Sequence, residues 1–122
     1  MSLTRMYEGD SWSLIENGRT ILTVQETDAD GKILVSLTGS LRNDTDQFFQ
    51  DELIALATVG KDITVDCKGL EYICSSCLNS LLSVQQKMDA MQKGGSLTLC
   101  NVPEKIYSEM ERLNLHELLM IE

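Results

Sequence analysis

The chain has 122 residues, of which 43% are hydrophobic and 24% are charged, a composition typical of one globular domain with its own core. Its formal net charge of -9 argues against binding to nucleic acids or to anionic membrane surfaces, because both attract basic proteins. No apolar run approaches the roughly 20 residues that a bilayer-spanning helix needs, so we expect no membrane insertion.

Residues 1–20 are interpreted as an N-terminal segment that precedes the folded domain. They lack the apolar stretch of a secretory signal, and the first letters, MSL, are consistent with a cloning remnant. We therefore expect a cytoplasmic protein whose cysteines are reduced. These cysteines are Cys67, Cys74, Cys77 and Cys100.

Two strands joined by a tight turn are predicted at the start of the folded domain, which we expect to span residues 21–122. Residues 19–26 and 31–37 are rich in β-forming side chains such as Ile21 and Val35. The intervening letters TDADG are typical of a hairpin turn, so the two strands are expected to pair antiparallel.

A first helix is predicted over residues 44–58, with Asn43 or Asp44 as its cap and Gly60 at its end. Its apolar residues recur at spacings of four and three, and they are Phe49, Leu53 and Leu56. This spacing gives one apolar stripe along the helix, which we expect to face the core.

A strand, a helix, a strand and a helix are predicted in the second half of the chain. Residues 62–67 form a strand that residues 70–73 continue, and residues 96–100 form the next one. The helix between them ends at Gly94, and the last helix has Pro103 in its first turn. Their predicted buried residues are Leu78, Leu81, Val84 or Gln85, Met88 and Met91, followed by Ile106, Met110 and Leu113. The closing letters HELLMIE are interpreted as a short strand or a loose tail.

In chain order these elements read β-β-α-β-α-β-α, which predicts a single α/β domain. We expect a mixed sheet of four or five strands with helices packed against it. The strand–helix–strand unit of the second half predicts a right-handed crossover between parallel strands. In such sheets the loops at the carboxyl ends of strands carry functional residues, and residues 74–77 form one of these loops.

The letters CSSC at residues 74–77 allow three interpretations. A Cys-x-x-Cys pair at a helix start is the geometry that lowers a thiol pKa, as in thioredoxin-like proteins, although the chain lacks the opening β-α unit of that fold. Cys67 and Cys100 would complete a four-thiolate zinc site, although a second Cys-x-x-Cys is missing. In the third interpretation, Ser75 or Ser76 caps the helix through its hydroxyl group.

Across residues 21–122 the sequence resembles the STAS domain, and in particular the bacterial anti-sigma factor antagonists. The resemblance rests on LTGSL with Thr45 soon after, on ITVDCKGLEYICSSCLNSLL, on KGGSLTLCNV and on the closing MERLNLHELLMIE. It implies a STAS-like fold whose function is to bind partners. It implies no enzymatic activity, no cofactor and no metal ion.

The resemblance further implies a partner-switching cycle. The unphosphorylated antagonist binds an anti-sigma factor that is also a serine kinase, phosphorylation by this kinase releases it, and a phosphatase restores it. The first hydroxyl residue of the family signature is the phosphoacceptor, and it corresponds to Ser75. The residues expected to contact the partner are Cys74, Ser76, Cys77, Asp44 and Thr45.

Three positions depart from the antagonist pattern. Cys74 stands where the antagonists carry aspartate, Cys77 stands where they carry glycine, and Arg42 stands where an acidic residue is common. Two alternatives therefore stay open. In one, the chain is a STAS docking module of a transport or sensory complex, and Ser75 only caps a helix. In the other, the chain is a redox-responsive variant in which Cys74 and Cys77 oxidise.

Overall fold

The protein is described by a computed structural model over residues 3–91 and 94–122. Within these ranges the strands are β1 (Thr4–Glu8), β2 (Ser11–Glu16), β3 (Arg19–Ala29), β4 (Lys32–Leu41), β5 (Asp62–Ile73) and β6 (Leu97–Cys100). The helices there are α1 (Asp46–Ala57), α2 (Ser75–Met91) and α3 (Glu104–Arg112). Residues 1 and 2, at the suspected cloning remnant, lie outside the described part.

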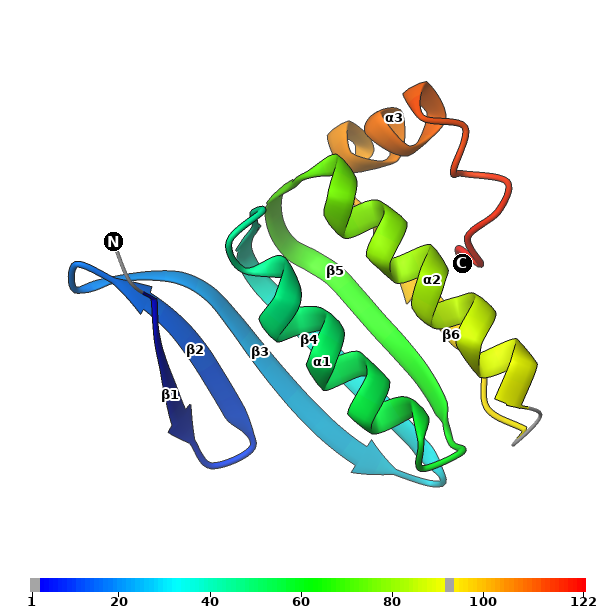
Figure 1. Ribbon diagram of the computed structural model, residues 1–122, viewed down its shortest axis with the longest axis horizontal. Coiled ribbons are helices and arrows are strands. Elements are labelled where there is room, and N and C mark those ends of the chain that lie inside the picture. The colour runs from blue at the N-terminus through cyan, green and yellow to red at the C-terminus, as the bar shows by residue number, and fades with distance from the viewer. Residues whose placement is uncertain (1–2, 92–93) are drawn as a thin grey trace.

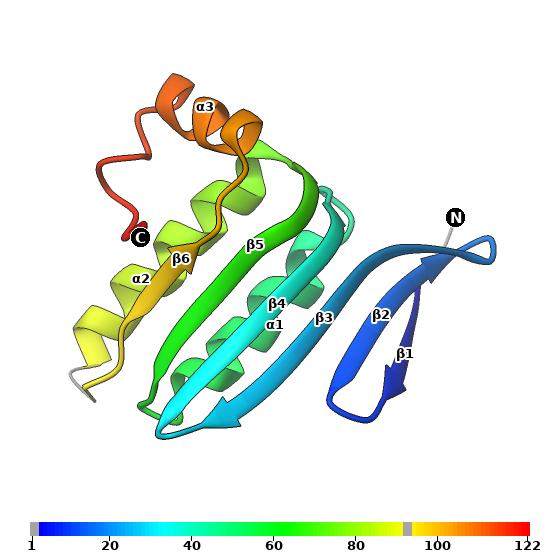
Figure 2. The same cartoon turned by 180° about the vertical axis from the view of Figure 1, so that it is seen from behind.

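The strands form one mixed sheet in the order β1-β2-β3-β4-β5-β6. Strands β1 to β4 pair antiparallel, whereas β4, β5 and β6 pair parallel. Helices α1 and α2 make the two crossovers and lie side by side on one face of the sheet (Figure 1). Figure 2 shows the other face, on which the described chain places neither of these helices. The mixed α/β architecture predicted from the sequence is confirmed.

Within the described residues the sheet has six strands, so the prediction of four or five is wrong. The two unpredicted strands, β1 and β2, form a hairpin from residues that we assigned to an N-terminal segment. On β2, Trp12 and Leu14 alternate with more accessible residues and are only 4% and 0% exposed. This period of two in the letters SWSLIE was a strand signal that the prediction did not use.

The predicted hairpin between β3 and β4 is confirmed, with longer strands than expected. Its tight turn consists of Asp30 and Gly31, whose φ angles of 54° and 76° are both positive. Two consecutive positive φ angles define the type I′ turn, whose twist matches that of paired strands, and Asp-Gly is one of its preferred sequences.

The hydrophobic core lies between the sheet and the two helices on its face. Buried residues of α1 include Phe49 and Leu53, and those of α2 include Leu78, Leu81, Val84, Gln85 and Met88. Leu56, Met91 and Leu113, which we predicted to be buried, are only partly buried. Burying apolar area at about 25 cal/mol per Å² is the main force that holds both helices on the sheet.

The end of the chain returns to the sheet edge. Ile121 forms a single parallel bridge with Leu99 of β6. The closing residues, predicted as either a short strand or a loose tail, therefore form one bridge rather than a full strand. The Gln85 side chain reinforces this arrangement: its Nε2 donates to the Leu118 carbonyl oxygen over 2.8 Å, and its Oε1 accepts from the Met120 N–H over 2.9 Å.

Candidate functional site

The candidate functional site lies where β4 and β5 end side by side. These parallel strands are paired up to their last residues, Leu41 and Ile73. The Cys74 N–H then donates to the Leu41 carbonyl oxygen over 2.9 Å. The pairing places residues 42–45 beside residues 74–77, and we call these two segments the strand-end site. Carboxyl ends of parallel strands are the usual location of binding sites in α/β sheets.

Helix α2 begins with a cysteine as its cap. The Cys74 carbonyl oxygen accepts from the N–H groups of Cys77 and Leu78, over 3.1 and 3.2 Å. The Cys74 Sγ also accepts from the Cys77 N–H over 3.3 Å, in the position that a serine or aspartate oxygen usually takes. The prediction that Ser75 or Ser76 caps the helix is therefore wrong. Both serines lie inside the first turn and are exposed.

The two serines of the first turn have different surroundings. The Ser76 Oγ donates to the Asn43 Oδ1 over 2.8 Å and thereby joins the two segments of the strand-end site. Ser75 lines a shallow pocket of about 410 Å³ between the end of β5 and α3. Tyr72 lines the same pocket, together with the cations Lys105 and Arg112 and the carboxylates Glu71 and Glu109.

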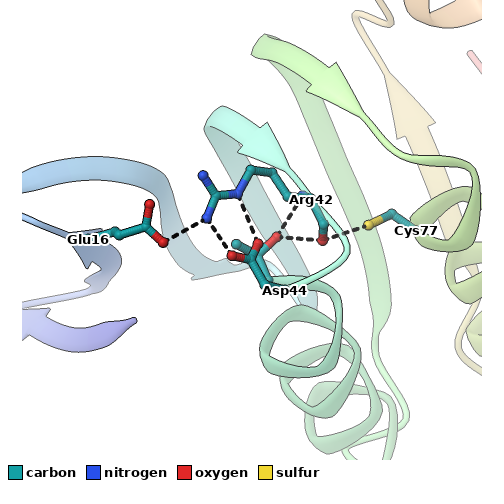
Figure 3. A network of polar contacts seen from close by, with 5 residues as sticks. Glu16, Arg42, Asp44 and Cys77 are labelled. Atoms are coloured by element: carbon teal, nitrogen blue, oxygen red, sulfur yellow. Dashed lines mark hydrogen bonds and ion pairs between the residues drawn. The ribbon is translucent and has the colours of Figure 1, made fainter. Parts of the chain in front are cut away.

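The thiols of Cys74 and Cys77 are in contact beneath the serines. Their Sγ atoms are 2.7 Å apart, and the two residues are only 5% and 0% exposed. The Cys77 thiol donates to the Arg42 carbonyl oxygen over 3.4 Å (Figure 3). Burial, followed by the neighbouring Cys74, raises the pKa of Cys77. For Cys77, this is the opposite of the lowered pKa expected under the thioredoxin-like interpretation.

The four-thiolate zinc site is not formed. In residues 3–91 and 94–122, no group of three or more His, Cys, Asp and Glu side chains is arranged to hold a metal ion. Cys67 is buried, and desolvation, assisted by Cys100 and Asp66, raises the pKa of its thiol to about 12. It is therefore a neutral thiol at physiological pH.

Arg42 links the strand-end site to the N-terminal hairpin. Its guanidinium contacts both carboxylate oxygens of Asp44, with 2.9 Å between Nε and Oδ1, and its Nη2 lies 3.3 Å from the Glu16 Oε2 (Figure 3). The hydrogen bonds to Arg42 lower the pKa of Asp44. Arg42, the departure from the acidic residue of the antagonists, thus holds Asp44 ionised at the edge of the site.

Thr45, rather than the predicted Asn43 or Asp44, is the cap residue of α1. Its side chain is fully buried and bonded to its own loop. The Thr45 Oγ1 accepts from the Arg42 N–H over 2.8 Å and donates to the Arg42 carbonyl oxygen over 3.0 Å. This closed turn fixes the direction in which the chain leaves β4.

Sequence reasoning missed Glu16 and Asn43 as parts of this site. Glu16 lies at the end of β2, so the unused strand pattern of β2 was the signal that could have placed it. Asn43 was considered only as a helix cap. Its contact with Ser76 joins residues 33 positions apart, and no local pattern encodes such a contact.

Comparison with known proteins identifies the family. The family model described as "Mlab, STAS domain" matches residues 23–122, which is most of the chain. The chain belongs to the STAS domain family. No match was found among curated proteins.

Solved structures share the STAS fold at low sequence identity. An anti-sigma factor antagonist from Mycobacterium paratuberculosis has a TM-score of 0.72 and 17% identity, over 82% of this chain and 84% of that one. The unphosphorylated antagonist SpoIIAA has a TM-score of 0.67 and 16% identity, over 81% and 87% of the two chains. The murine anion transporter Slc26a9 has a TM-score of 0.57 and 16% identity, over 70% of this chain and 14% of the transporter.

Among residues 3–91 and 94–122, no helix combines the length and the apolar character that crossing a bilayer requires.

Proposed function

We propose that this STAS domain is a cytoplasmic anti-sigma factor antagonist, which binds an anti-sigma factor with serine kinase activity and is released when Ser75 is phosphorylated. A phosphatase would restore the binding form. The observation that carries the proposal is the position of Ser75, exposed in the first turn of α2 at the strand-end site. The likeness to antagonist structures supports this use of the fold.

The position of Ser75 at the start of α2 makes a phosphate group there compatible with the fold of the free domain. A phosphoserine adds about -1.5 to -2 charges at neutral pH. At a helix N-terminus, unpaired N–H groups and the helix dipole stabilise negative charge by roughly 0.3–1 kcal/mol. The pocket that Ser75 lines holds two cations, Lys105 and Arg112, and two carboxylates, Glu71 and Glu109, so its formal charge is balanced. We therefore expect the fold to tolerate the modification.

A partner docked on the same surface would reject the modified form. Burying a poorly paired charge in an interface costs on the order of 2–5 kcal/mol. At about 1.4 kcal/mol per tenfold change, this corresponds to roughly a thirtyfold to several thousandfold loss of affinity. Phosphorylation thus weakens the binding of the partner and does not disrupt the fold of the free domain.

The residues proposed for partner binding divide into two groups by exposure. Ser76 and Asp44 are exposed and can contact a partner directly. Thr45, Cys74 and Cys77 are buried. We propose that these three buried residues hold the exposed ones in place. In this role the Cys74 thiol caps α2 without placing a carboxylate beside the phosphoacceptor.

Phosphorylation and binding together test the proposal. The chain would be incubated with ATP and the serine-kinase anti-sigma factor encoded nearest to its gene, and phosphopeptides would be mapped by mass spectrometry. We expect the phosphate on Ser75, none in Ser75→Ala, and full modification in the control Ser108→Ala, which removes an exposed serine of α3 outside the strand-end site. Titration calorimetry should show that Ser75→Asp binds at least thirtyfold more weakly than Ser75→Ala. Equal binding by these two variants would sink the proposal.

A second candidate function is a docking module of a transport complex, without phosphorylation. The Mlab description of the matching family and the likeness to a transporter structure favour it. In this case Ser75 would remain unmodified, Ser75→Asp and Ser75→Ala would bind alike, and pull-down from the source organism would recover transporter subunits.

A further inference from the structure

We propose that Cys74 and Cys77 are a redox modification site, at which a hydroperoxide converts the two thiols into an intramolecular disulfide. The site lies below the exposed serines, and its chemistry requires no partner. The proposal therefore goes beyond the proposed function and does not depend on it.

The first observation is the contact between the two sulfur atoms. They are 2.7 Å apart, whereas carbon atoms in contact lie about 3.5–4.0 Å apart and sulfur is larger. A disulfide bond measures about 2.05 Å. The sulfurs therefore need to approach by less than about 1 Å, which rotation of the two side chains can supply. The helix start holds the thiols in a position to join.

The second observation is the direction of the thiol protons. The single hydrogen of the Ser76 hydroxyl is donated to the Asn43 Oδ1, so the Cys74 thiol must be the donor in its 3.1 Å contact with the Ser76 Oγ. The Cys77 thiol donates to the Arg42 carbonyl oxygen. Each thiol thus has a hydrogen-bond acceptor other than the neighbouring sulfur, so the contact between the two sulfur atoms does not depend on an S–H bond between them.

The two thiols have different surroundings, which assigns their roles. Cys74 is the more accessible of the two, at 5% exposure against 0% for Cys77, and its sulfur accepts the Cys77 N–H. Burial raises the pKa of Cys77, which keeps this thiol neutral. Cys74 is therefore the thiol that meets the oxidant, and Cys77 is the thiol that resolves the intermediate.

The reaction balances in two steps. Cys74 gives up its thiol proton as its sulfur attacks one oxygen of hydrogen peroxide, so that an S–O bond forms, the O–O bond breaks and the leaving hydroxide takes up that proton to give water. The Cys77 sulfur then attacks the Cys74 sulfur, so that the S–S bond forms, the S–O bond breaks, and hydroxide leaves with the Cys77 proton as water. Two electrons pass from the sulfurs to the peroxide.

Oxidation also changes the contacts of residues 42–45. The disulfide has no S–H group, so the Ser76 hydroxyl and the Arg42 carbonyl oxygen each lose a donor. The bond from Cys77 to Arg42 ties the start of α2 to the loop that carries Asp44, and the Ser76 hydroxyl that Cys74 contacts is itself bonded to Asn43 of that loop. The oxidised form should therefore differ from the reduced form in the backbone environment of the strand-end site.

Mass spectrometry of the full chain tests the site directly. Trypsin cleavage after Lys68 and Lys87 places Cys74 and Cys77 in one peptide, residues 69–87, and the other two cysteines elsewhere. After treatment with hydrogen peroxide and then with an alkylating reagent in denaturant, which exposes every buried thiol, we expect this peptide to be unalkylated and lighter by two hydrogen atoms. Dithiothreitol should restore two alkylatable thiols. Cys67 and Cys100 should remain alkylated throughout.

Variants and spectroscopy complete the test. The matched control Cys67→Ser/Cys100→Ser should still form the disulfide, whereas Cys77→Ser should stop at a sulfenic acid that dimedone traps on Cys74. In ¹H–¹⁵N spectra, the wild type should show its largest oxidation shifts at residues 42–45 and 74–78. Alkylation of both thiols after peroxide, or overoxidation of Cys74 without a disulfide, would overturn the proposal. These results are independent of whether Ser75 is phosphorylated.

Discussion

At the scale of single residues, one backbone oxygen connects the two segments of the strand-end site. The Arg42 carbonyl oxygen accepts hydrogen bonds from the Thr45 hydroxyl and from the Cys77 thiol. The Thr45 hydroxyl additionally accepts the Arg42 N–H. Buried polar groups contribute most to a unique conformation when each of them has a hydrogen-bond partner. The Thr45 hydroxyl, although small, therefore fixes the conformation of residues 42–45.

Replacing Thr45 with valine tests the buried hydroxyl. Thr45→Val keeps the shape of the side chain but leaves the Arg42 N–H without its acceptor. We expect it to lower the free energy of unfolding by about 1–3 kcal/mol. The matched control Thr45→Ser keeps the hydroxyl and loses one methyl group, which costs about 0.8 kcal/mol. Urea denaturation of both variants checks this, and a smaller loss for valine than for serine would contradict it.

At the scale of elements, the sequence patterns predicted those parts of the fold that local periodicity encodes. The stripes of α1 and α2, the turn at residues 30 and 31 and the parallel strands all follow from spacing and turn chemistry. The caps did not follow, because Thr45 and Cys74 became cap residues through contacts made in the folded state. The strand-end site was located from the strand order, whereas the contacts of Glu16 and Asn43 join distant segments.

Strand β4 passes so close to β3 that it tolerates only glycine at one position. Gly39 has a φ of 109°, and a Cβ there would overlap the Ile21 carbonyl oxygen. Gly31, with a φ of 76° and nothing within 4 Å, is a control with the backbone strain alone. We expect Gly31→Ala to lower the free energy of unfolding by about 1–2 kcal/mol. Gly39→Ala should lose at least about 1 kcal/mol more, because steric overlap adds to the strain. Equal losses in thermal or urea unfolding would refute the close approach.

At the scale of the whole molecule, a charged cluster holds the N-terminal hairpin against α1. Arg5 of β1 lies over the Trp12 ring, 4.0 Å from its centroid, and forms an ion pair with Glu52 of α1 over 2.8 Å. Glu26 of β3 lies 3.4 Å from the Trp12 Nε1. Desolvation, followed by a hydrogen bond and charge repulsion from Glu52, raises the pKa of Glu26 to about 7.

This raised pKa predicts a pH-dependent stability. A carboxyl group with a higher pKa in the folded state stabilises the fold while it is protonated, so its contribution is complete below about pH 4.5 and is lost as the pH rises through about 7. Glu26→Gln removes this titration. We expect the wild type to lose stability relative to Glu26→Gln between pH 5 and pH 8, as urea midpoints at both values would show. A stability difference between the wild type and Glu26→Gln that stays constant from pH 5 to pH 8 would contradict the raised pKa of Glu26.

The hairpin of β1 and β2 also has a consequence for how the protein behaves in solution. The N–H and C=O groups of β3 that pair with β2 cannot form hydrogen bonds with other molecules. Without β2, strand β3 would expose a long row of unpaired N–H and C=O groups next to Leu22 and Val24. Strands of neighbouring copies could pair with these groups. The β1–β2 hairpin therefore protects β3 from pairing with other copies of the chain. The short, mostly exposed β1 is the outermost strand.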